Sequence, residues 1–243
     1  MIFRLLLVAS LFSLVGNAQA QRNYATTSAE YIFSLSQTAA ADSVDVEDVL
    51  RFSGFANTGY QRHFDFGSTV GLFTGVNVRN VGMITKVDTL RLKHRAYALA
   101  VPLAVKIGNL EKRFYVAPGA EAELMFNYKV KEFVRGKKIS KRNEWFSDEV
   151  TMFNPSVFMH VNMGKAGYLK FKYYLFDFLA PADENSGYRV RDVGSHPIPA
   201  YTQESKLFYV SWGTMIGGNK KLESKEGTAE PALRRPGQRK RDI

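Results

Sequence analysis

Residues 112–131 read KRFYVAPGAEAELMFNYKVK, and their side chains separate by polarity at alternate positions. One set is apolar and runs from Phe114 to Val130. The other set carries the charged and amide side chains: Glu121, Glu123, Asn127, Lys129 and Lys131. Because successive side chains of a strand point to opposite faces, the pattern predicts one long strand with an apolar and a polar face. A soluble sheet buries such an apolar face, whereas a transmembrane barrel turns it to lipid.

The length of this strand favours the membrane. From Phe114 to Phe126 it extends roughly 40 Å, at about 3.3 Å per residue. A tilt of about 45° leaves roughly 28 Å along the membrane normal, close to the ~25 Å apolar band of outer-membrane barrels. Phe114 at one end and Phe126 with Tyr128 at the other occupy the positions of interfacial aromatic residues. We therefore expect a transmembrane strand, with a soluble sandwich as the alternative.

The N-terminus has the pattern of an export signal. Arg4 supplies the charged region, residues 5–15 the apolar region, and Ala18-Gln19-Ala20 the small-residue cleavage motif. The apolar run is too short to cross a membrane as a helix. The predicted organisation is a signal peptide over 1–20, a barrel over 21–217 and a basic tail over 218–243, with location in the bacterial outer membrane.

Composition excludes several classes of protein. The chain has 243 residues and no cysteine, which rules out a disulfide scaffold, a thiolate metal site and a cysteine nucleophile. No run of 18 or more apolar residues follows the signal, so insertion into a membrane must use strands. The formal net charge of +10 suits phosphate-rich surfaces. For an exported protein we expect outer-membrane lipid and lipopolysaccharide as partners and not nucleic acid.

Alternation elsewhere in the chain predicts an eight-stranded antiparallel up-and-down transmembrane barrel. The expected strands are 29–37, 48–64, 66–79, 92–107, 112–131, 150–163, 168–179 and 207–216. From the second strand onward, short connections (63–65, 108–111, 164–167) alternate with long ones (80–91, 132–149, 180–205). Outer-membrane barrels combine short periplasmic turns with longer extracellular loops, and an even strand number lets the sheet close.

Two of these strands carry a family resemblance. The segment YALAVPLAVK (97–106) is followed, after a turn, by YVAPGA (115–120). This pair resembles the PorT-like outer-membrane β-barrel family of Bacteroidetes, whose members carry a similar Tyr, apolar, Ile-Pro-Leu, apolar, Lys strand followed by a Tyr-Val…Gly strand. Here Val101 replaces the usual isoleucine. The resemblance implies an eight-stranded barrel and a link to the type IX secretion machinery, with periplasmic or secretion-machinery proteins as partners.

The interior of an eight-stranded barrel is just filled by side chains. Aromatic side chains predicted to point inward and plug it are Phe55, Phe73, Tyr115, Phe158 and Tyr174. Charged side chains predicted to form a lumenal network are Arg51, Lys106, Glu121, Glu123, Lys170 and Lys172. Their mixed sign favours structural ion pairs, because buried charges must be paired. The alternative of a paired-carboxylate site at Glu121 and Glu123 fails, because a plugged lumen has no room for a substrate.

No other constellation indicates catalysis. Ser156 and His160 share a face but are separated by about 13 Å of strand, beyond hydrogen-bond reach. The sequence has no metal-ligand spacing and no glycine-rich phosphate loop. We expect no catalytic, cofactor-binding or metal site.

The connection 132–149 is rich in basic and aromatic residues. Candidates for contact with the surface or with lipopolysaccharide are Arg135, Lys137, Lys138, Lys141, Arg142 and Trp145. A loop merely kept soluble by its charge explains the composition equally well. Residues 218–243 are basic and lack periodicity, and we expect them to be a disordered periplasmic segment.

Three functions follow. The first is a non-enzymatic integral outer-membrane barrel with a structural or assembly role, for which the family resemblance implies a link to secretion. The second is an outer-membrane barrel enzyme acting on lipid or lipopolysaccharide. The third is a soluble periplasmic barrel that binds an apolar ligand, which requires a polar exterior and an apolar interior.

Overall fold

The computed structural model describes residues 22–40, 45–180, 192–193, 196–197 and 202–218. Within these ranges the chain is all-β apart from one 3₁₀ turn, η1 (Gly164–Ala166). No helix in the described ranges is long and apolar enough to cross a membrane. The expected signal peptide (1–20), the tail from 219 onward and most of the expected loop 180–205 lie outside the described residues.

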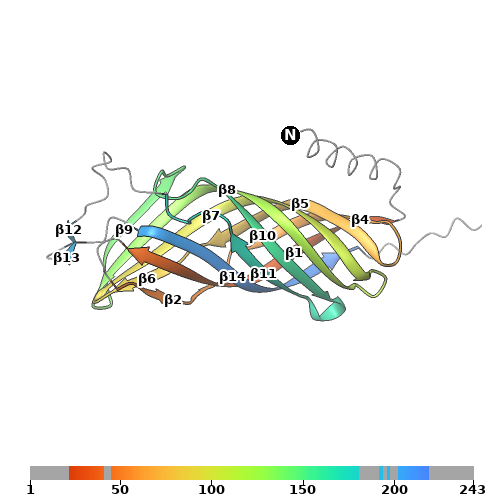
Figure 1. Ribbon diagram of the computed structural model, residues 1–243, viewed down its shortest axis with the longest axis horizontal. Coiled ribbons are helices and arrows are strands. Elements are labelled where there is room, and N and C mark those ends of the chain that lie inside the picture. Colours follow the sequence, from red (N-terminus) through yellow and green to blue (C-terminus); the bar gives the residue numbers. More distant parts are fainter. Residues whose placement is uncertain (1–21, 41–44, 181–191, 194–195, 198–201, 219–243) are drawn as a thin grey trace, which may run out of the picture.

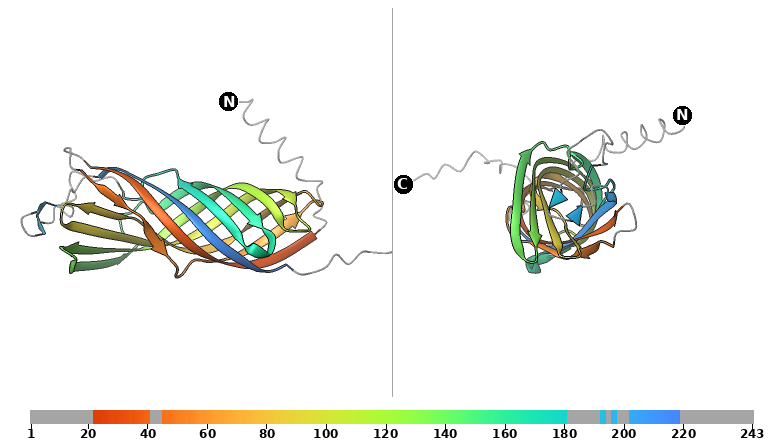
Figure 2. Two further views of the ribbon diagram at one scale, coloured as in Figure 1. Left: turned by 90° about the horizontal axis from the view of Figure 1, so that it is seen from below. Right: turned by 90° about the vertical axis from the view of Figure 1, so that its left-hand side faces the viewer.

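Eight antiparallel strands close into a ring, which Figure 1 shows from the side and the right-hand view of Figure 2 shows along the long axis of the molecule. Each ring strand pairs with the next one in the chain, and β1 pairs with β14 to complete the closure. The ring strands are β1 (Arg22–Ala40), β4 (Thr58–Asp65), β5 (Val70–Val81), β7 (Leu90–Asn109), β8 (Phe114–Val134), β10 (Phe153–Met163), β11 (Tyr168–Tyr174) and β14 (Thr202–Gly217). The predicted eight-stranded up-and-down barrel is confirmed.

Further strands lie mostly at one end of the ring. Those in the same sheet are β2 (Glu47–Val49), β3 (Arg51–Ser53), β6 (Ile84–Val87) and β9 (Lys137–Trp145). A separate pair consists of β12 (Asp192–Val193) and β13 (His196–Pro197). We call the end that carries β2, β6 and β9 the hairpin end (Figure 1). The opposite, short-turn end carries the connections 66–69, 110–113 and 164–167.

Two connections predicted to be long form hairpins: residues 80–91, expected to extend the preceding strand and then form a loop, and residues 132–149, expected to form a loop. In 80–91, the chain continues into β6 and returns as β7. In 132–149, β8 turns at Arg135-Gly136 into β9. Both turn residues have positive φ, 49° and 78°, as a two-residue type I′ hairpin requires. The prediction of a loop over 132–149 was wrong, because the basic side chains of β9 concealed its alternation.

The barrel wall is apolar outside and small or polar inside. On β7 the exposed side chains alternate with Ala98, Ala100 and Ala104, which are at most 1% exposed. We define the apolar belt by outward-facing apolar residues of the ring: Leu99, Val101, Leu103, Val105, Ile107, Val116, Leu124, Val157, Met159, Phe171, Tyr173, Val210 and Trp212. These side chains are 38–60% exposed. This polarity is the reverse of the one that a soluble apolar carrier requires.

A register shift changes the direction of the side chains near the hairpin end of β8. The pairing of β7 with β8 slips between Tyr97 and Ala98. Up to Leu124 the outward residues of β8 are those predicted, but beyond the shift Tyr128 and Val130 are buried. The prediction that these two residues face outward was therefore wrong, because a bulge adds one residue and inverts the later alternation.

A second irregularity lies between β3 and β4. Phe55, predicted to plug the lumen, is 75% exposed. The chain leaves the ladder here: Ala56 has φ 59°, and the Asn57 side chain donates to the Ser53 carbonyl oxygen at 3.0 Å. The prediction for Phe55 was wrong because this break takes the residue out of the regular alternation.

Of the three prolines in the ring strands as described, Pro102 and Pro118 lie where ladder pairing lapses, whereas Pro155 of β10 is opposite Ala122. The β5–β7 register runs through Thr74↔Leu103 and Asn77↔Ala100, with no pairs between them, and Pro102 falls in this gap. Likewise the β7–β8 pairing is interrupted opposite Pro118. A proline has no N–H to donate, so the missing ladder bonds follow directly from the sequence.

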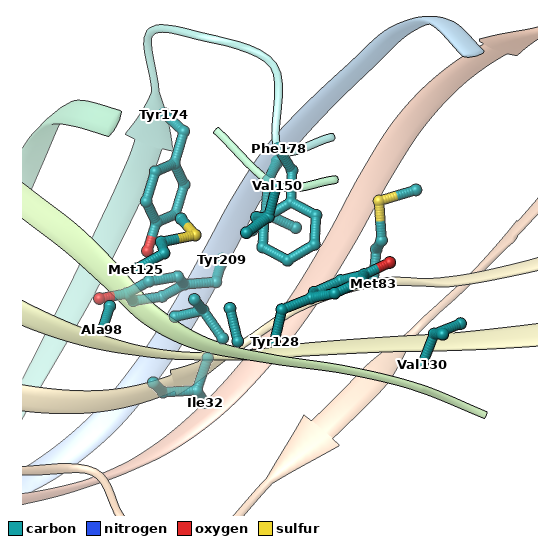
Figure 3. Close-up of a cluster of buried hydrophobic side chains, with 13 residues drawn as sticks. Ile32, Met83, Ala98, Met125, Tyr128, Val130, Val150, Tyr174, Phe178 and Tyr209 are labelled. Carbon is teal, nitrogen blue, oxygen red and sulfur yellow. The ribbon is translucent and has the colours of Figure 1, made fainter. Parts of the chain in front are cut away.

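The interior is layered along the barrel axis. Nearest the short-turn end is a small apolar cluster: Phe73, Ala104, Leu110, Tyr115, Ala117 and Phe158. Toward the hairpin end is a larger one that includes Ile32, Met83, Met125, Tyr128, Tyr174, Phe178 and Tyr209 (Figure 3). The order along β8, from Tyr115 through Glu121 and Glu123 to Met125, places charged residues between the two clusters. Side chains therefore fill the lumen at all three levels.

Candidate functional site

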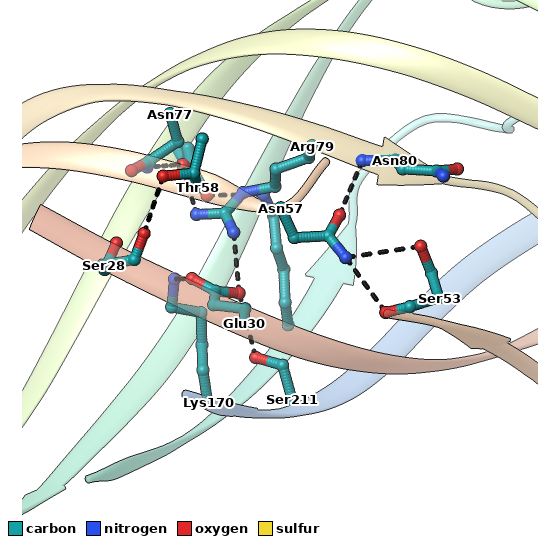
Figure 4. Close-up of polar contacts among 12 residues, drawn as sticks. Ser28, Glu30, Ser53, Asn57, Thr58, Asn77, Arg79, Asn80, Lys170 and Ser211 are labelled. Atoms are coloured by element: carbon teal, nitrogen blue, oxygen red, sulfur yellow. Dashed lines mark hydrogen bonds and ion pairs between the residues drawn. The ribbon is translucent and has the colours of Figure 1, made fainter. Parts of the chain in front are cut away.

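The charged layer centres on Arg79 of β5. Its guanidinium forms an ion pair with Glu30 of β1 at 2.7 Å (Figure 4). It forms another with Glu121 of β8 at 3.0 Å. A longer contact of 3.7 Å joins it to Glu123. All four side chains are at most 2% exposed. One buried cation therefore links carboxylates from two opposite parts of the ring.

Two lysines of β11 complete the layer. Lys170 Nζ lies 2.7 Å from Glu30 Oε1, and Lys172 Nζ lies 2.5 Å from Glu121 Oε2. Lys172 also contacts Glu123 directly. We name Glu30, Arg79, Glu121, Glu123, Lys170 and Lys172 the charged layer. Its three carboxylates and three cations balance, as a buried network requires.

Neutral side chains satisfy the remaining carboxylate oxygens. Tyr168 donates to Glu30 at 2.9 Å, and Tyr174 donates to Glu123 at 2.7 Å. Ser211 donates to Glu30 at 3.1 Å, and Asn77 donates to Glu121 at 2.6 Å. Because donors come from several strands, the layer connects the ring across its interior and stabilises one arrangement of the wall.

Lys106, which sequence analysis assigned to the same network, belongs to a second cluster at the short-turn end. It forms an ion pair with Asp65 of β4, and Arg22 of β1 binds the same carboxylate at 2.5 Å. Tyr24 accepts a hydrogen bond from Lys106 at 3.4 Å. This cluster joins the start of β1 to the ends of β4 and β7.

Arg51, also assigned to the network, stands apart from both clusters. Its Nη1 donates to the backbone oxygen of Asn80 at 3.2 Å, and its Nη2 donates to the side-chain oxygen of Asn80 at 2.6 Å. The structure thus brings together four of the six proposed residues, Glu121, Glu123, Lys170 and Lys172, and separates Lys106 and Arg51 from them.

Glu30 and Arg79, which connect the network, were not among the residues predicted from the sequence. The signal was present. Glu30 alternates with the outward Tyr31, and Arg79 has the same parity as the inward Asn77. Both residues would have been found if the inward-facing row had been extended to Glu30 at the start of the first strand and to Arg79 at the end of the third.

The charged layer offers no free reactive group. Each of its carboxylates is bound by at least two cationic or hydroxyl partners. The Ser156 hydroxyl donates to the Glu121 backbone oxygen at 3.1 Å. His160 packs against aromatic rings, and neither of its nitrogens has a hydrogen-bond partner among the described atoms. In the described part of the chain, no group of three or more potential ligand side chains could hold a metal ion.

The basic candidates of the 132–149 segment lie on the β8–β9 hairpin. Arg135 forms the turn, and Lys137, Lys138, Lys141 and Trp145 are exposed on β9. Arg142 differs from them. It points to the other face, where it contacts Glu144 at 3.4 Å and forms an ion pair with Glu149. Its charge is therefore neutralised and is not available to an outside anion.

Fold and polarity together define the class of protein: an eight-stranded transmembrane β-barrel of the outer-membrane type, apolar toward its surroundings and filled by a balanced charged layer.

No protein-family model matches the chain, and no curated protein matches it in sequence. Among solved structures it is similar to Ail, the attachment invasion locus protein of Yersinia pestis, with a TM-score of 0.36 and 9% identity over 79% of this chain and 96% of Ail. It is also similar to the outer-membrane protein AlkL (TM-score 0.35, 11% identity, 83% of this chain and 92% of AlkL). It is similar as well to the outer-membrane protein OprG of Pseudomonas aeruginosa (TM-score 0.29, 9% identity, 80% of this chain and 93% of OprG). These likenesses are weak, and the fold assignment rests on the strand pairing itself.

Proposed function

We propose that the protein is an integral outer-membrane barrel that has a structural or assembly role and performs no catalysis. The observation that carries the proposal is the layered, fully occupied interior. A balanced charged layer lies between two apolar clusters in the described part of the chain, and an eight-stranded barrel is only wide enough for side chains to fill it, which supports a lumen without room for a substrate.

The absence of a catalytic role is supported by how the polar groups are used. Ion pairs bind the carboxylates of the charged layer, which gives them a structural task. A general base or nucleophile needs a reacting atom within hydrogen-bond reach, and these side chains face only one another. An enzyme acting on lipid or lipopolysaccharide would require a different arrangement at the rim.

The secretion-associated part of the proposal comes from the sequence. The segments 97–106 and 115–120 resemble the PorT-like family of Bacteroidetes, and that resemblance implies a link to type IX secretion. These two segments form the paired strands β7 and β8 of the wall. We infer that a barrel with a filled lumen would act in secretion as a membrane anchor for other proteins and not as the conduit.

The test is purification from the native outer membrane after crosslinking. We expect the protein in the outer-membrane fraction, with migration in SDS gels that changes on boiling, and with partner proteins recovered at stoichiometric levels. A crosslinker at Lys165, on the short-turn end, and another at Lys137, on the hairpin end, would assign partners to one side of the membrane. Recovery as a soluble periplasmic monomer would contradict the membrane assignment, and recovery without any partner would contradict the assembly role.

A further inference from the structure

Where β7, β8 and β9 continue beyond the apolar belt, their outward side chains are basic. Lys93 lies opposite Lys131, which in turn lies opposite Lys141. In the next row, Arg95 lies opposite Lys129. A third row contains Arg91 and Lys138, which lie on either side of Phe133. We define the basic face as the cations of these three rows: Arg91, Lys93, Arg95, Lys129, Lys131, Lys138 and Lys141. Like charges from three strands are thus aligned side by side.

The bulge in β8 creates this face. Without the register shift between Tyr97 and Ala98, Lys129 and Lys131 would continue the inward row of Glu121 and Glu123. The shift instead buries Tyr128 and turns the two lysines outward, beside Lys93 and Arg95. One irregularity of the backbone therefore separates the basic outer face from the apolar interior of the hairpin end.

This arrangement is unfavourable in isolation. Like charges directly opposite each other on neighbouring strands destabilise a sheet. In the described part of the chain, no ion pair joins Lys93, Lys131 or Lys141 to a carboxylate. The nearby carboxylates Glu144 and Glu149 are engaged by Arg142 on the other face.

The cations of β7 likewise have no carboxylate partner: within the described ranges, no ion pair joins Arg91 or Arg95 to a carboxylate. The buried Nε atoms of Arg91 and Arg95 have no hydrogen-bond partner among the described atoms. Arg95 lies over the Tyr97 ring at 4.4 Å, and Lys93 lies over the Phe133 ring at 4.9 Å. Partial burial and then the neighbouring Arg91 and Lys131 lower the pKa of Lys93. A bound anion would therefore reduce the repulsion among the cations of this face.

An aromatic row fixes the height of this face relative to the membrane. Tyr97, Phe126 and Trp145 stack across β7, β8 and β9, with ring centroids 6.4 and 5.9 Å apart. Such rows mark the interface between hydrocarbon and headgroups in outer-membrane barrels. The apolar belt begins on one side of the row, with Leu99 and Leu124, and the basic face on the other. The cations therefore lie at headgroup height and point sideways, toward neighbouring lipids.

We propose that the basic face binds the phosphates of a lipid A molecule in the surrounding outer leaflet. This inference rests on the proposed membrane location. Lipid A carries two phosphates on one headgroup, so a single molecule can neutralise more than one row of cations, and the linked second contact strengthens the first. A glycerophospholipid with one phosphate lacks this advantage. A soluble polyanion fits less well, because the face points toward the lipid and not away from the membrane.

Native mass spectrometry of the purified barrel tests the proposal. The protein is released from micelles that contain equal amounts of diphosphoryl lipid A, monophosphoryl lipid A and phosphatidylglycerol. We expect wild type to retain diphosphoryl lipid A preferentially, and K93Q/K131Q to reduce that occupancy at least about fivefold, because it removes two of the three cations in the central row. The matched control K112Q/K165Q removes the same charge from exposed positions at the short-turn end and should leave occupancy unchanged.

A thermal unfolding series provides a second readout that does not depend on recovered lipid. In detergent without lipid A, K93Q/K131Q should unfold at the same or a higher temperature than wild type, because a repulsive pair has been removed. Diphosphoryl lipid A should raise the unfolding temperature of wild type and of K112Q/K165Q, but not that of K93Q/K131Q.

Unchanged lipid A occupancy in K93Q/K131Q, equal retention of phosphatidylglycerol by wild type, or an equal thermal shift in all three proteins would overturn the lipid A site. Preferential capture of a soluble sulfated polysaccharide over lipid A would overturn it in favour of a polyanion surface. In each case the barrel would still fractionate with the outer membrane, so failure of this inference is distinguishable from failure of the proposed function.

Discussion

At the scale of single residues, the interior depends on a few cations that each serve more than one carboxylate. Arg79 and Lys172 both bind Glu121, and both also approach Glu123. In a buried network the loss of one partner is costly, because the other is left as an uncompensated charge in a medium of low polarity. Shared cations make this cost larger than the pairwise contacts alone suggest.

Replacement of Lys172 by methionine tests this dependence. The substitution leaves Glu121 and Glu123 with Arg79 as their shared cation, and we expect it to destabilise the barrel by about 3–5 kcal/mol. Urea unfolding of protein folded into lipid vesicles measures the change. The double variant K172M/E123Q removes one of the stranded charges and should recover a large part of the loss. A K172M barrel as stable as wild type would contradict the account of the charged layer.

His94 supplies a pH-dependent contribution outside the apolar belt. Its Nδ1 lies 2.7 Å from the Tyr128 hydroxyl oxygen, and burial, followed by Arg142, lowers the pKa of His94 to about 4. Between pH 6.5 and 4 the unfolded chain therefore binds a proton at His94 that the folded chain does not. Stability consequently falls as pH decreases through this window, by at most about 3 kcal/mol.

The variant His94→Gln isolates this effect. We expect its free energy of unfolding to decline less than that of wild type between pH 7 and pH 4.5. Contributions of the other histidines cancel in the difference between the two proteins. Parallel pH profiles for wild type and variant would show that folding does not lower the pKa of His94.

At the scale of elements, irregularities decide which face a residue occupies. The β7–β8 register shift turns Lys129 and Lys131 outward, and the break after β3 exposes Phe55. Pro102 and Pro118 interrupt ladders without altering the register on either side. Proline can be located from the sequence, whereas a bulge leaves no comparable mark, because any residue can be the extra one.

Gly136 allows a test confined to one element. It has φ 78° in the β8–β9 turn, and a Cβ there would meet nothing within 4 Å, so backbone strain alone opposes a side chain. We expect Gly136→Val to destabilise the hairpin by about 1–2 kcal/mol. Hydrogen exchange should accelerate for amides of β9 and remain unchanged in the ring strands β10 and β11. Gly136→Asn, which tolerates this conformation better, should have a smaller effect; acceleration throughout the ring would mean that the hairpin and the barrel unfold together.

These differences explain which parts of the molecule the sequence could predict. Period-two alternation identified the ring strands and most inward residues, because burial on one face imposes it on each strand. It identified Glu121, Glu123, Lys170 and Lys172 but missed Glu30 and Arg79, which lie at the margins of the predicted strand faces. Of the basic face, the sequence indicated only Lys138 and Lys141 of β9; the cations of β7 and β8 were missed, because their position depends on a bulge and on the alignment of β7, β8 and β9.

At the scale of the whole molecule, the membrane assignment requires that exposed apolar side chains contact lipid within the apolar belt and water at the hairpin end. Leu103 and Ile139 are matched for this comparison. Both are apolar and exposed, 60% and 45%, but Leu103 lies in the apolar belt on β7 and Ile139 on the β9 hairpin.

The most direct measurement is therefore the free energy of unfolding of Leu103→Arg and Ile139→Arg, each folded into lipid vesicles and compared with wild type. A charge on the lipid face near the middle of the membrane costs about 2–4 kcal/mol, and a charge near or beyond the interface costs about 0–1 kcal/mol. We predict a loss in the first range for Leu103→Arg and in the second for Ile139→Arg. Equal, small losses for both variants would mean that water surrounds the belt, and would contradict the transmembrane barrel.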